Sequence, residues 1–265
     1  MTSKNNLFDL SGKVIIVTGA GGLLGQQHCE AIASYGGSPV LLDLTLDVIE
    51  DLANSLNSKY NVNASYYAVD ITNEDCIKNN SVALLKKYGK INALINNAAN
   101  NPSVGPSHSA KEFSRLENFP LNKWIDDLSV GLTGAFLCCK HYGYAISKNL
   151  DGGVIINISS DLGLIAPDQR LYEKTDTPKE HQITKPVSYS VAKTGLLGLT
   201  RYISTYWAND NVRCNAICPG GVKNDQPQDF LKEVSLRIPL NRLANVDEYK
   251  SSIIYLLSDA SSYLN

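Results

Sequence analysis

Short apolar runs alternate with longer segments of mixed polarity along this 265-residue chain. The apolar runs predict strands at residues 14–18, 39–43, 65–69, 91–96, 154–158 and 212–217. The segments between them predict helices over residues 23–35, 47–60, 73–88, 121–148 and 187–208. Continuously apolar strands indicate a sheet covered on both faces, so we expect an α/β fold, a doubly wound parallel sheet in one domain spanning residues 1–265.

The turn after the first apolar run is rich in glycine. It has the sequence T-G-A-G-G-L-L-G and places Gly19, Gly21, Gly22 and Gly25 between the first strand and the first helix. Glycine allows a tight turn and lets a pyrophosphate approach the helix N-terminus, where free N–H groups favour negative charge. The spacing is not the usual G-x-G-x-x-G, so a turn that holds no ligand is the alternative.

Carboxylates close the second and third strands. Asp43 lies about 20 positions beyond the glycine turn, where an acidic residue can bind the ribose 2′-hydroxyl of NAD and repel the 2′-phosphate of NADP. Leu44 and Thr45 offer no cation for that phosphate, so we expect NAD; the alternative for Asp43 is a helix cap. Asp70 either faces the adenine or, with Thr72, caps the next helix.

Tyr189 and Lys193, in Y-S-V-A-K, are four positions apart and therefore share one face of a predicted helix. A cation at ~4 Å stabilises a phenolate by about 4 kcal/mol at an effective dielectric near 20, and desolvation opposes part of this. We therefore expect Lys193 to lower the pKa of Tyr189 towards that of a general acid/base, with Ser160 holding the substrate oxygen. Without the other motifs, an exposed helical pair would be the simpler explanation.

Composition excludes several other classes of protein. The net charge is −2 and no basic stripe is present, so no nucleic-acid partner is expected. No apolar run reaches the roughly 18 residues of a membrane helix, and the first ten residues contain no signal core, so we expect a cytoplasmic protein. The six cysteines lack metal-site spacing and are expected to be reduced, without a metal; the four histidines are expected at the surface or in packing.

Five motifs in this order resemble the short-chain dehydrogenase/reductase family, from about residue 7 to the end. They are the glycine turn, N-N-A-A at 96–99, I-N-I-S-S at 156–160, Y-S-V-A-K at 189–193 and C-P-G-G-V at 218–222. The resemblance implies a Rossmann fold and hydride transfer between NAD and an alcohol or carbonyl. It also implies Tyr189 as acid/base, Lys193 on the nicotinamide ribose and Ser160 orienting the substrate.

The same resemblance implies a set of cofactor contacts along the carboxyl edge of the sheet. They are Gly19, Gly22, Leu23, Leu24, Gly25, Asp43, Asp70, Ile71, Asn97, Ala98, Ala99, Tyr189, Lys193, Pro219, Gly220 and Val222.

The chain departs from the family pattern at four places. Leu23 stands where the middle glycine is usual, and Gly131 replaces an asparagine that assists a water-mediated proton relay. Ser160 and Tyr189 are unusually far apart, so residues 162–186 contain an insertion, which we expect to act as a lid; the alternative is a solvated loop. The family's last edge strand, with its D-G-G turn, has no counterpart in the sequence.

The insertion carries Arg170, Tyr172, Glu173 and Lys174, which favour a small, polar, sugar-derived substrate. It is similar to oxidoreductases of bacterial surface-sugar (legionaminic or nonulosonic acid) pathways. The alternatives are a 3-oxoacyl reductase, which Asp43 disfavours, and a nucleotide-binding subunit with impaired catalysis, which Gly131 favours. Sugar epimerases share Y-x-x-x-K but have a larger C-terminal part.

The family resemblance also implies assembly through the two long helices. We expect a homodimer or homotetramer. The expected apolar contacts come from Cys138, Cys139 and Tyr142, or from Leu196, Leu199 and Ile203.

Overall fold

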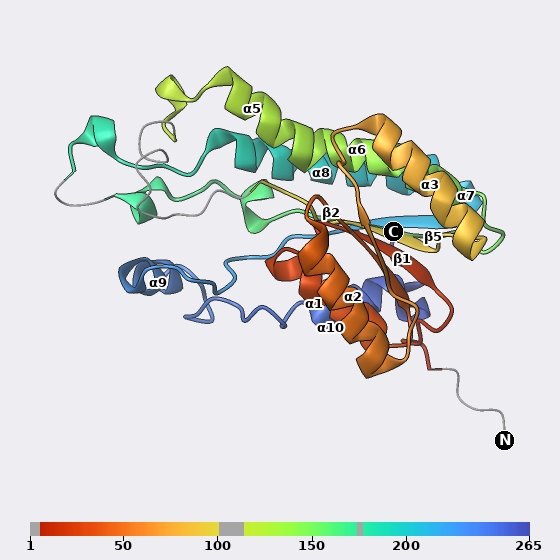
Figure 1. Cartoon of the computed structure of the whole chain (residues 1–265). Helices are drawn as coiled ribbons and strands as arrows, with labels where there is room; N and C mark the ends of the chain where they lie inside the picture. Colours follow the sequence, from red (N-terminus) through yellow and green to blue (C-terminus); the bar gives the residue numbers. More distant parts are fainter. Residues whose placement is uncertain (1–5, 101–113, 174–176) are drawn as a thin grey trace.

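The computed structural model describes residues 6–100, 114–173 and 177–265, and it contains a six-stranded parallel sheet (Figure 1). The strands are β1 (Val14–Thr18), β2 (Ser38–Asp43), β3 (Ser65–Ala68), β4 (Ala93–Asn96), β5 (Gly153–Ile158) and β6 (Val212–Ile217). Their order is β3-β2-β1-β4-β5-β6, so the chain winds outward from β1 in one direction and from β4 in the other. This confirms the predicted doubly wound sheet.

Helices cover both faces of the sheet (Figure 1). One face carries α1 (Leu23–Ser34), α2 (Leu46–Tyr60) and α10 (Lys250–Leu257), and the other carries α3 (Glu74–Tyr88) and α8 (Val187–Tyr206) with the long helix that starts at Leu121. The strands divide their side chains between the two layers. Ile15 and Val17 of β1 belong to one apolar cluster, whereas Val14 and Ile16 belong to the other.

The long helix is not regular throughout. It consists of α5 (Leu121–Leu128), a π-helical segment (Ser129–Thr133), α6 (Gly134–Cys138), a second π-helical segment (Cys139–Gly143) and α7 (Tyr144–Ser147). Glycines let it approach its neighbours closely: a Cβ on Gly134 would lie 2.7 Å from Ile71 Cδ1, and one on Gly143 would lie 2.7 Å from Trp207 Cζ3. The predicted range was right, but the π-helical turns were not foreseen.

The assembly contacts expected from the sequence were assigned to the wrong helix faces. Cys138, Cys139 and Tyr142 are buried in the cluster against the sheet, as are Leu196 and Ile203, and Leu199 packs against that cluster. These residues stabilise the interior of one chain. All six cysteine thiols are free, and four of them are buried.

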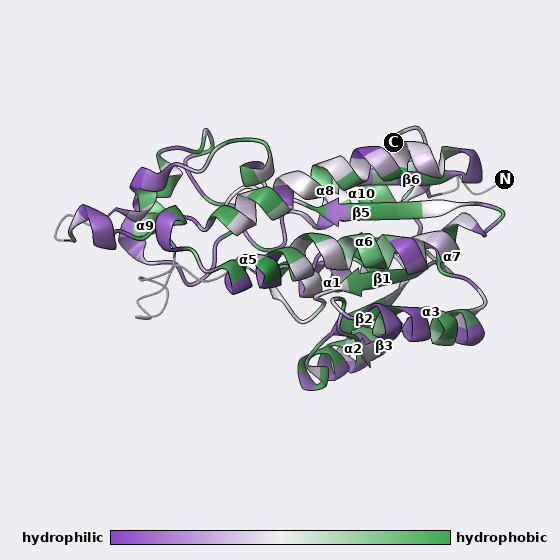
Figure 2. Cartoon of the chain, turned by 90° about the horizontal axis from the view of Figure 1, so that it is seen from above, coloured by the Kyte–Doolittle hydropathy of each residue, from purple (hydrophilic) through white to green (hydrophobic). Residues whose placement is uncertain are grey.

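Residues 162–186 are less irregular than expected. Their described residues, 162–173 and 177–186, include two 3-10 turns, Gln169–Tyr172 and Lys179–His181, and overlap a third at Asp161–Gly163. A helix that the sequence analysis did not predict, α9 (Gln228–Ser235), lies on the side towards which β5 points (Figure 2). The inserted segment and α9 therefore lie beyond the carboxyl edge of the sheet, where ligands bind in open α/β folds.

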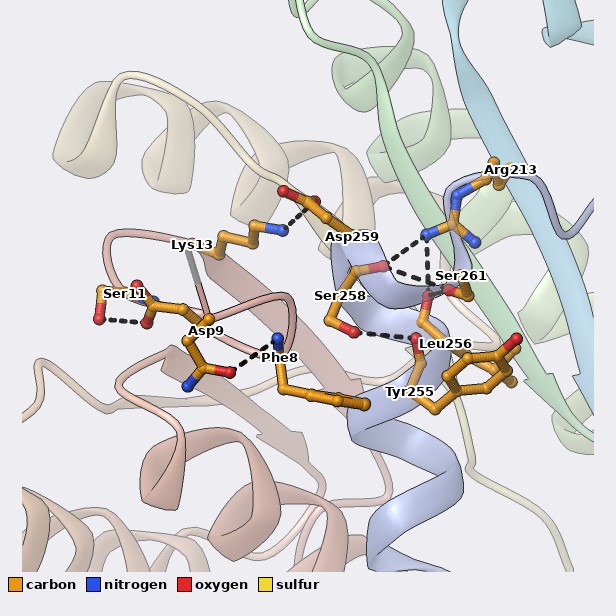
Figure 3. Close-up of polar contacts among 11 residues, drawn as sticks. Phe8, Asp9, Ser11, Lys13, Arg213, Tyr255, Leu256, Ser258, Asp259 and Ser261 are labelled. Atoms are coloured by element: carbon orange, nitrogen blue, oxygen red, sulfur yellow. Dashed lines mark hydrogen bonds and ion pairs between the residues drawn. The ribbon is translucent and has the colours of Figure 1, made fainter. Parts of the chain in front are cut away.

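The end of the described chain is fastened to the edge strand β6 and to the residue before the central strand β1 (Figure 3). Arg213 on β6 donates from Nη2 to the carbonyls of Leu256 (3.0 Å) and Ser258 (3.3 Å). Asp259 forms an ion pair of 3.1 Å with Lys13, just before β1. These contacts hold the residues that follow α10 against β6 and β1.

No helix within residues 6–100, 114–173 and 177–265 has both the length and the hydropathy that crossing a bilayer requires.

His28 on α1 is a buried polar group of this core. It is 1% exposed, and neither ring nitrogen has a hydrogen-bond partner among the described residues. Burial lowers the pKa of His28 to about 4. Because the unfolded chain has the ordinary histidine pKa of about 6.5, the unfolded state binds more protons between these two values.

We therefore predict that stability is full above pH 6.5 and falls as the pH drops towards 4. At pH 5 the free energy of unfolding should be about 2 kcal/mol below its value at pH 7.5 on account of this residue. Urea unfolding at the two pH values measures the difference. His28→Leu is the control, since it removes the titrating group at similar volume; an equal loss of stability in that variant would contradict the prediction.

Candidate active site

The glycine turn joins β1 to α1 and is held in a shape that only glycine tolerates. Gly19 has a φ of +62°, and a Cβ there would lie 2.8 Å from Ala98 Cα. A Cβ on Gly25 would lie 2.1 Å from the carbonyl oxygen of Gly19. Gly22 precedes α1 without any side-chain cap, so the first N–H groups of this helix remain available to an anion.

Asp43 lies beside this turn. Its Oδ2 accepts a hydrogen bond from the N–H of Gly21 (2.9 Å), and its Oδ1 accepts one from the N–H of Leu44 (2.8 Å). It does not cap α2, which begins after Thr45, so the helix-cap alternative for Asp43 is wrong. The carboxylate at the end of β2 is thus fixed next to the glycine turn, which fits the dinucleotide hypothesis.

Asp70 has a local role in the structure. Its Oδ1 accepts hydrogen bonds from the N–H (2.8 Å) and the Oγ1 (2.6 Å) of Thr72. The cap of α3 is Asn73, whose side chain accepts from two backbone N–H groups, so neither Asp70 nor Thr72 caps this helix. Ile71 is buried against Gly134 of the long helix.

The N-N-A-A segment is bound to the end of β1 through Thr18, which the sequence analysis did not single out. Asn97 donates from its N–H to Thr18 Oγ1 (3.0 Å) and from Nδ2 to the carbonyls of Thr18 (2.9 Å) and Gly19 (3.0 Å). The N–H of Ala98 also donates to Thr18 Oγ1 (3.1 Å). These bonds place residues 97–99 beside the glycine turn, and the threonine preceding Gly19 was the available signal.

The structure brings Ser160, Tyr189 and Lys193 together. Ser160 lies two residues beyond the end of β5, and its side chain influences the ionisation of the Tyr189 phenol. Lys193 lies one turn further along α8; its Nζ donates to the carbonyl of Ile158 (2.7 Å) and lies 5.8 Å from the centroid of the Tyr189 ring. The three side chains converge at the carboxyl end of β5.

Burial, however, changes the electrostatics that the sequence predicted. The pKa of Tyr189 is raised, chiefly by burial and further by the charge of Asp161, while the hydrogen bond with Ser160 lowers it. Burial also lowers the pKa of Lys193 to about 8, and the neighbouring ammonium of Lys185 adds to this. The expectation that Lys193 would lower the pKa of Tyr189 below its ordinary value is therefore wrong for the chain on its own.

Three further residues surround the phenol. Lys185 Nζ lies 3.8 Å from the centroid of the Tyr189 ring. Asp161 accepts from Ser160 Oγ (2.8 Å) and from the N–H of Leu162 (2.8 Å). The pKa of Tyr172 is raised to about 12, mainly by burial and also by Tyr189 and Asp161. The sequence analysis did not assign roles to Lys185 or Asp161, because their positions depend on how the insertion folds.

Gly131 lies in the first π-helical segment, opposite α8. A Cβ there would lie 3.2 Å from the Cβ of Ala192, the residue before Lys193. Four residues earlier, buried Asp127 accepts from Ser188 Oγ (2.5 Å) and from Lys123 Nζ (2.6 Å). The long helix and α8 are thus closely packed and tied by a charged hydrogen bond next to the site.

The C-P-G-G-V loop passes along the same edge. The carbonyl of Pro219 accepts from the N–H of Asp161 (2.9 Å), and the N–H of Gly220 donates to the Tyr249 hydroxyl (3.0 Å). Val222 pairs with Ala244 in an isolated parallel bridge. Pro219 and Gly220 therefore lie beside the Ser160–Asp161 turn, opposite the glycine-rich end of the site.

The insertion packs against α9 and the residues that follow it. Asp168 forms ion pairs of 2.8 Å with both Arg170 and Arg237, and the rings of Tyr172 and Phe230 have centroids 5.8 Å apart. Glu173 is exposed, and Lys174 lies outside the described residues.

A cleft of about 420 Å³ separates the insertion from residues 114–117 and the start of α8. It is lined by Ser114, Arg115, Leu116, Glu117, Pro167, Gln169, Thr184, Lys185, Pro186, Val187, Ser190 and Val191.

A dinucleotide fits this edge, since the glycine turn leaves backbone where side chains would intrude, and the free helix N-terminus lies beside it. In the described part of the chain, no group of three His, Cys, Asp or Glu residues is arranged to hold a metal ion.

Comparison with known proteins supports this assignment. A family model described as short chain dehydrogenase matches residues 13–172, and one described as Enoyl-(Acyl carrier protein) reductase matches residues 177–265. The NADP-dependent mannitol dehydrogenase of Alternaria alternata is 29% identical over 99% of this chain and 91% of its own length. The D-threitol dehydrogenase of Mycolicibacterium smegmatis is 27% identical over 97% of this chain and 90% of its own length.

Solved structures share the fold. NAD⁺-bound xylitol dehydrogenase gives a TM-score of 0.82 at 24% identity, with 97% of this chain and 96% of that chain covered. NADPH-dependent 3-quinuclidinone reductase from Rhodotorula rubra gives a TM-score of 0.83 at 24% identity, with 98% of this chain and 89% of that chain covered. From its motifs, its sheet and the matching family model, the chain belongs to the short-chain dehydrogenase/reductase family.

Proposed function

We propose that this oxidoreductase transfers a hydride between NAD and an alcohol or carbonyl of a small, polar, sugar-derived substrate. The observation that carries the proposal is the convergence of Ser160, Tyr189 and Lys193 beside a glycine turn suited to a dinucleotide. The nicotinamide supplies the hydride chemistry, and the side chains supply position and proton transfer.

Tyr189 is the proposed acid/base. Its raised pKa keeps the phenol protonated near neutral pH, which suits donation of a proton to a carbonyl oxygen during reduction. Alcohol oxidation requires the phenol to accept a proton instead, so oxidation should become faster as the pH rises. Ser160 orients the substrate oxygen, and Lys193, held by Ile158, serves the nicotinamide ribose.

The proposed cofactor contacts follow the carboxyl edge from the glycine turn to the Pro219 loop. They are Gly19, Gly22, Leu23, Leu24, Gly25, Asp43, Asp70, Ile71, Asn97, Ala98, Ala99, Tyr189, Lys193, Pro219, Gly220 and Val222. NAD is preferred in this proposal because Asp43 is fixed beside the glycine turn, where its charge would repel a 2′-phosphate.

The substrate class rests on two supports. The relatives include dehydrogenases named for mannitol and D-threitol, both polyols. The inserted segment carries Asp168, Arg170 and Tyr172 at the edge of the site, which favours a hydroxylated molecule over an acyl chain. Within this class we favour an intermediate of bacterial surface-sugar synthesis, with residues 162–186 as the lid.

Gly131 favours a second candidate, a nucleotide-binding subunit with impaired catalysis. Its position opposite Ala192 has no side chain to support a proton relay near Lys193. Under this alternative NAD binds and no substrate turns over. Under the main proposal, the enzyme converts at least one member of a panel of polyols, sugar phosphates and nucleotide sugars. The absorbance of NADH at 340 nm measures this turnover.

We also propose a homodimer or homotetramer that uses exposed faces of the long helices. The exposed apolar residues there include Leu121, Ile125, Phe136, Tyr144, Tyr202 and Tyr206. A cytoplasmic location agrees with six free cysteines and a nicotinamide-linked reaction.

Tyr189→Phe is predicted to lower kcat by more than about 100-fold, because the proton donor and acceptor is lost. NAD affinity, measured by calorimetry, should stay within about threefold, since the ring and Lys193 remain. Tyr35→Phe, the same substitution at an exposed tyrosine after α1, is the matched control. Normal turnover by Tyr189→Phe would remove this residue from the mechanism.

Asp43→Ala is predicted to weaken NAD binding roughly tenfold or more, which corresponds to loss of a charged hydrogen bond. The preference for NAD over NADP should narrow as well, because the repulsive charge is gone. Dissociation constants for both cofactors, measured on wild type and variant, provide the comparison; Asp47→Ala on the first turn of α2 is the control. An unchanged ratio of the two constants would mean that Asp43 only shapes the turn.

A further inference from the structure

The inserted segment brings a second ammonium group to the phenol of Tyr189. Lys185 Nζ lies 3.8 Å from the centroid of the Tyr189 ring, whereas Lys193 Nζ lies 5.8 Å from it. Both distances are within the range over which a cation interacts with an aromatic face, about 6 Å. The lysine of the Y-x-x-x-K motif is therefore the more distant of the two cations.

The backbone of Lys185 is fixed on both sides. Its N–H donates to Gln169 Oε1 (2.8 Å), which belongs to the 3-10 turn of the insertion. Pro186 follows it with a φ of −56° as the N-cap residue of α8, and Tyr189 is on the first turn of that helix. Fixed φ at the proline and the hydrogen bond to Gln169 together hold Lys185 over the ring.

The charges around the phenol respond to one another. Asp161 favours the protonated form of Lys185, whose pKa is lowered to about 8 mainly by burial. Lys185 in turn lowers the pKa of Lys193, and Cys218 opposes this. On the Tyr189 phenol, Asp161 raises the pKa and Ser160 lowers it. Tyr172 completes the group, since its own pKa is raised partly by Tyr189 and Asp161.

We propose that Lys185 is a positioning residue for the reaction, acting through Tyr189. Its ammonium holds the ring in place from one face and stabilises the ionised phenol. The insertion that shapes the entrance to the site would thereby also contribute to its acid/base chemistry. The proposal rests on the function assigned above to Tyr189, but ionisation of this phenol can be measured without any turnover.

The direct test is the titration of Tyr189 in the purified full-length chain. Tyrosine labelled with carbon-13 at Cζ gives a pH-dependent NMR signal, and the Tyr189 signal is the one that disappears in Tyr189→Phe. Lys185→Met should raise the pKa of Tyr189 by roughly one to three units, because an opposite charge within ~4–6 Å is lost. Lys185→Arg, which keeps the charge, should stay close to wild type.

Lys179→Met is the matched control, since Lys179 lies in the same insertion and is exposed. An unmoved Tyr189 titration in Lys185→Met would overturn the proposal, and so would an equal shift in Lys179→Met. If Lys185→Met does not fold, Lys185→Gln carries the same expectation and the same criterion.

A second measurement separates this proposal from the proposed function. With any alcohol that the enzyme oxidises, the pH of half-maximal kcat should move upward in Lys185→Met; a purely structural defect would lower kcat without moving that pH. Failure to find a substrate or to detect NAD by calorimetry would count against the proposed function. The Tyr189 titration would still decide whether Lys185 acts on the phenol.

Discussion

The side chain and the backbone carbonyl of Lys193 both form hydrogen bonds with residues at the end of β5, and the geometry of the site depends on these two bonds. Its Nζ donates to the carbonyl of Ile158 (2.7 Å), and its own carbonyl accepts from Ser159 Oγ (2.7 Å). A Cβ on Gly163 would lie 2.7 Å from the same Ser159 Oγ and 2.9 Å from the Lys193 carbonyl oxygen. A larger residue at position 163 would therefore disturb this hydrogen bond. Helix α8 is thereby oriented so that Tyr189 faces Ser160.

The environment of the phenol reflects a competition between burial and charge. Burial favours neutral groups, which is why the pKa of Tyr189 is raised and those of Lys185 and Lys193 are both lowered to about 8. The two ammonium groups disfavour each other, while Asp161 supports the charge on Lys185. Such a site responds strongly to any new charge placed in it, because charges interact more strongly in a buried, low-dielectric environment.

The sequence predicted the sheet well, because buried strands are continuous apolar runs whatever their neighbours are. The start of β4 was misplaced at Ile91. Asn92 precedes the strand and accepts from the N–H of Val14 (2.8 Å) through its side chain, a form of pairing that hydropathy does not reveal. The sequence also predicted that Tyr189 and Lys193 share one face of a helix, and both lie on α8, because this placement needs only helical spacing.

Features that depend on long-range packing could not be predicted. The exposed face of the long helix was misassigned, because sequence alone does not say which side meets the sheet; Tyr142 is buried and Tyr144 is not. The π-helical turns around Gly131 and the place of Lys185 over Tyr189 likewise depend on contacts between distant segments. The lowered pKa expected for Tyr189 failed for the same reason, since the degree of burial was unknown.

Asp168 joins two stretches that are far apart in sequence, since it pairs with Arg170 in the insertion and with Arg237 after α9. Tyr172 and Phe230 make a second connection between the same stretches. The inserted segment and the stretch from α9 to Arg237 therefore pack together as one unit. If residues 162–186 were exchanged alone, Phe230 and Arg237 would lose their partners, so a stable exchange has to include both stretches.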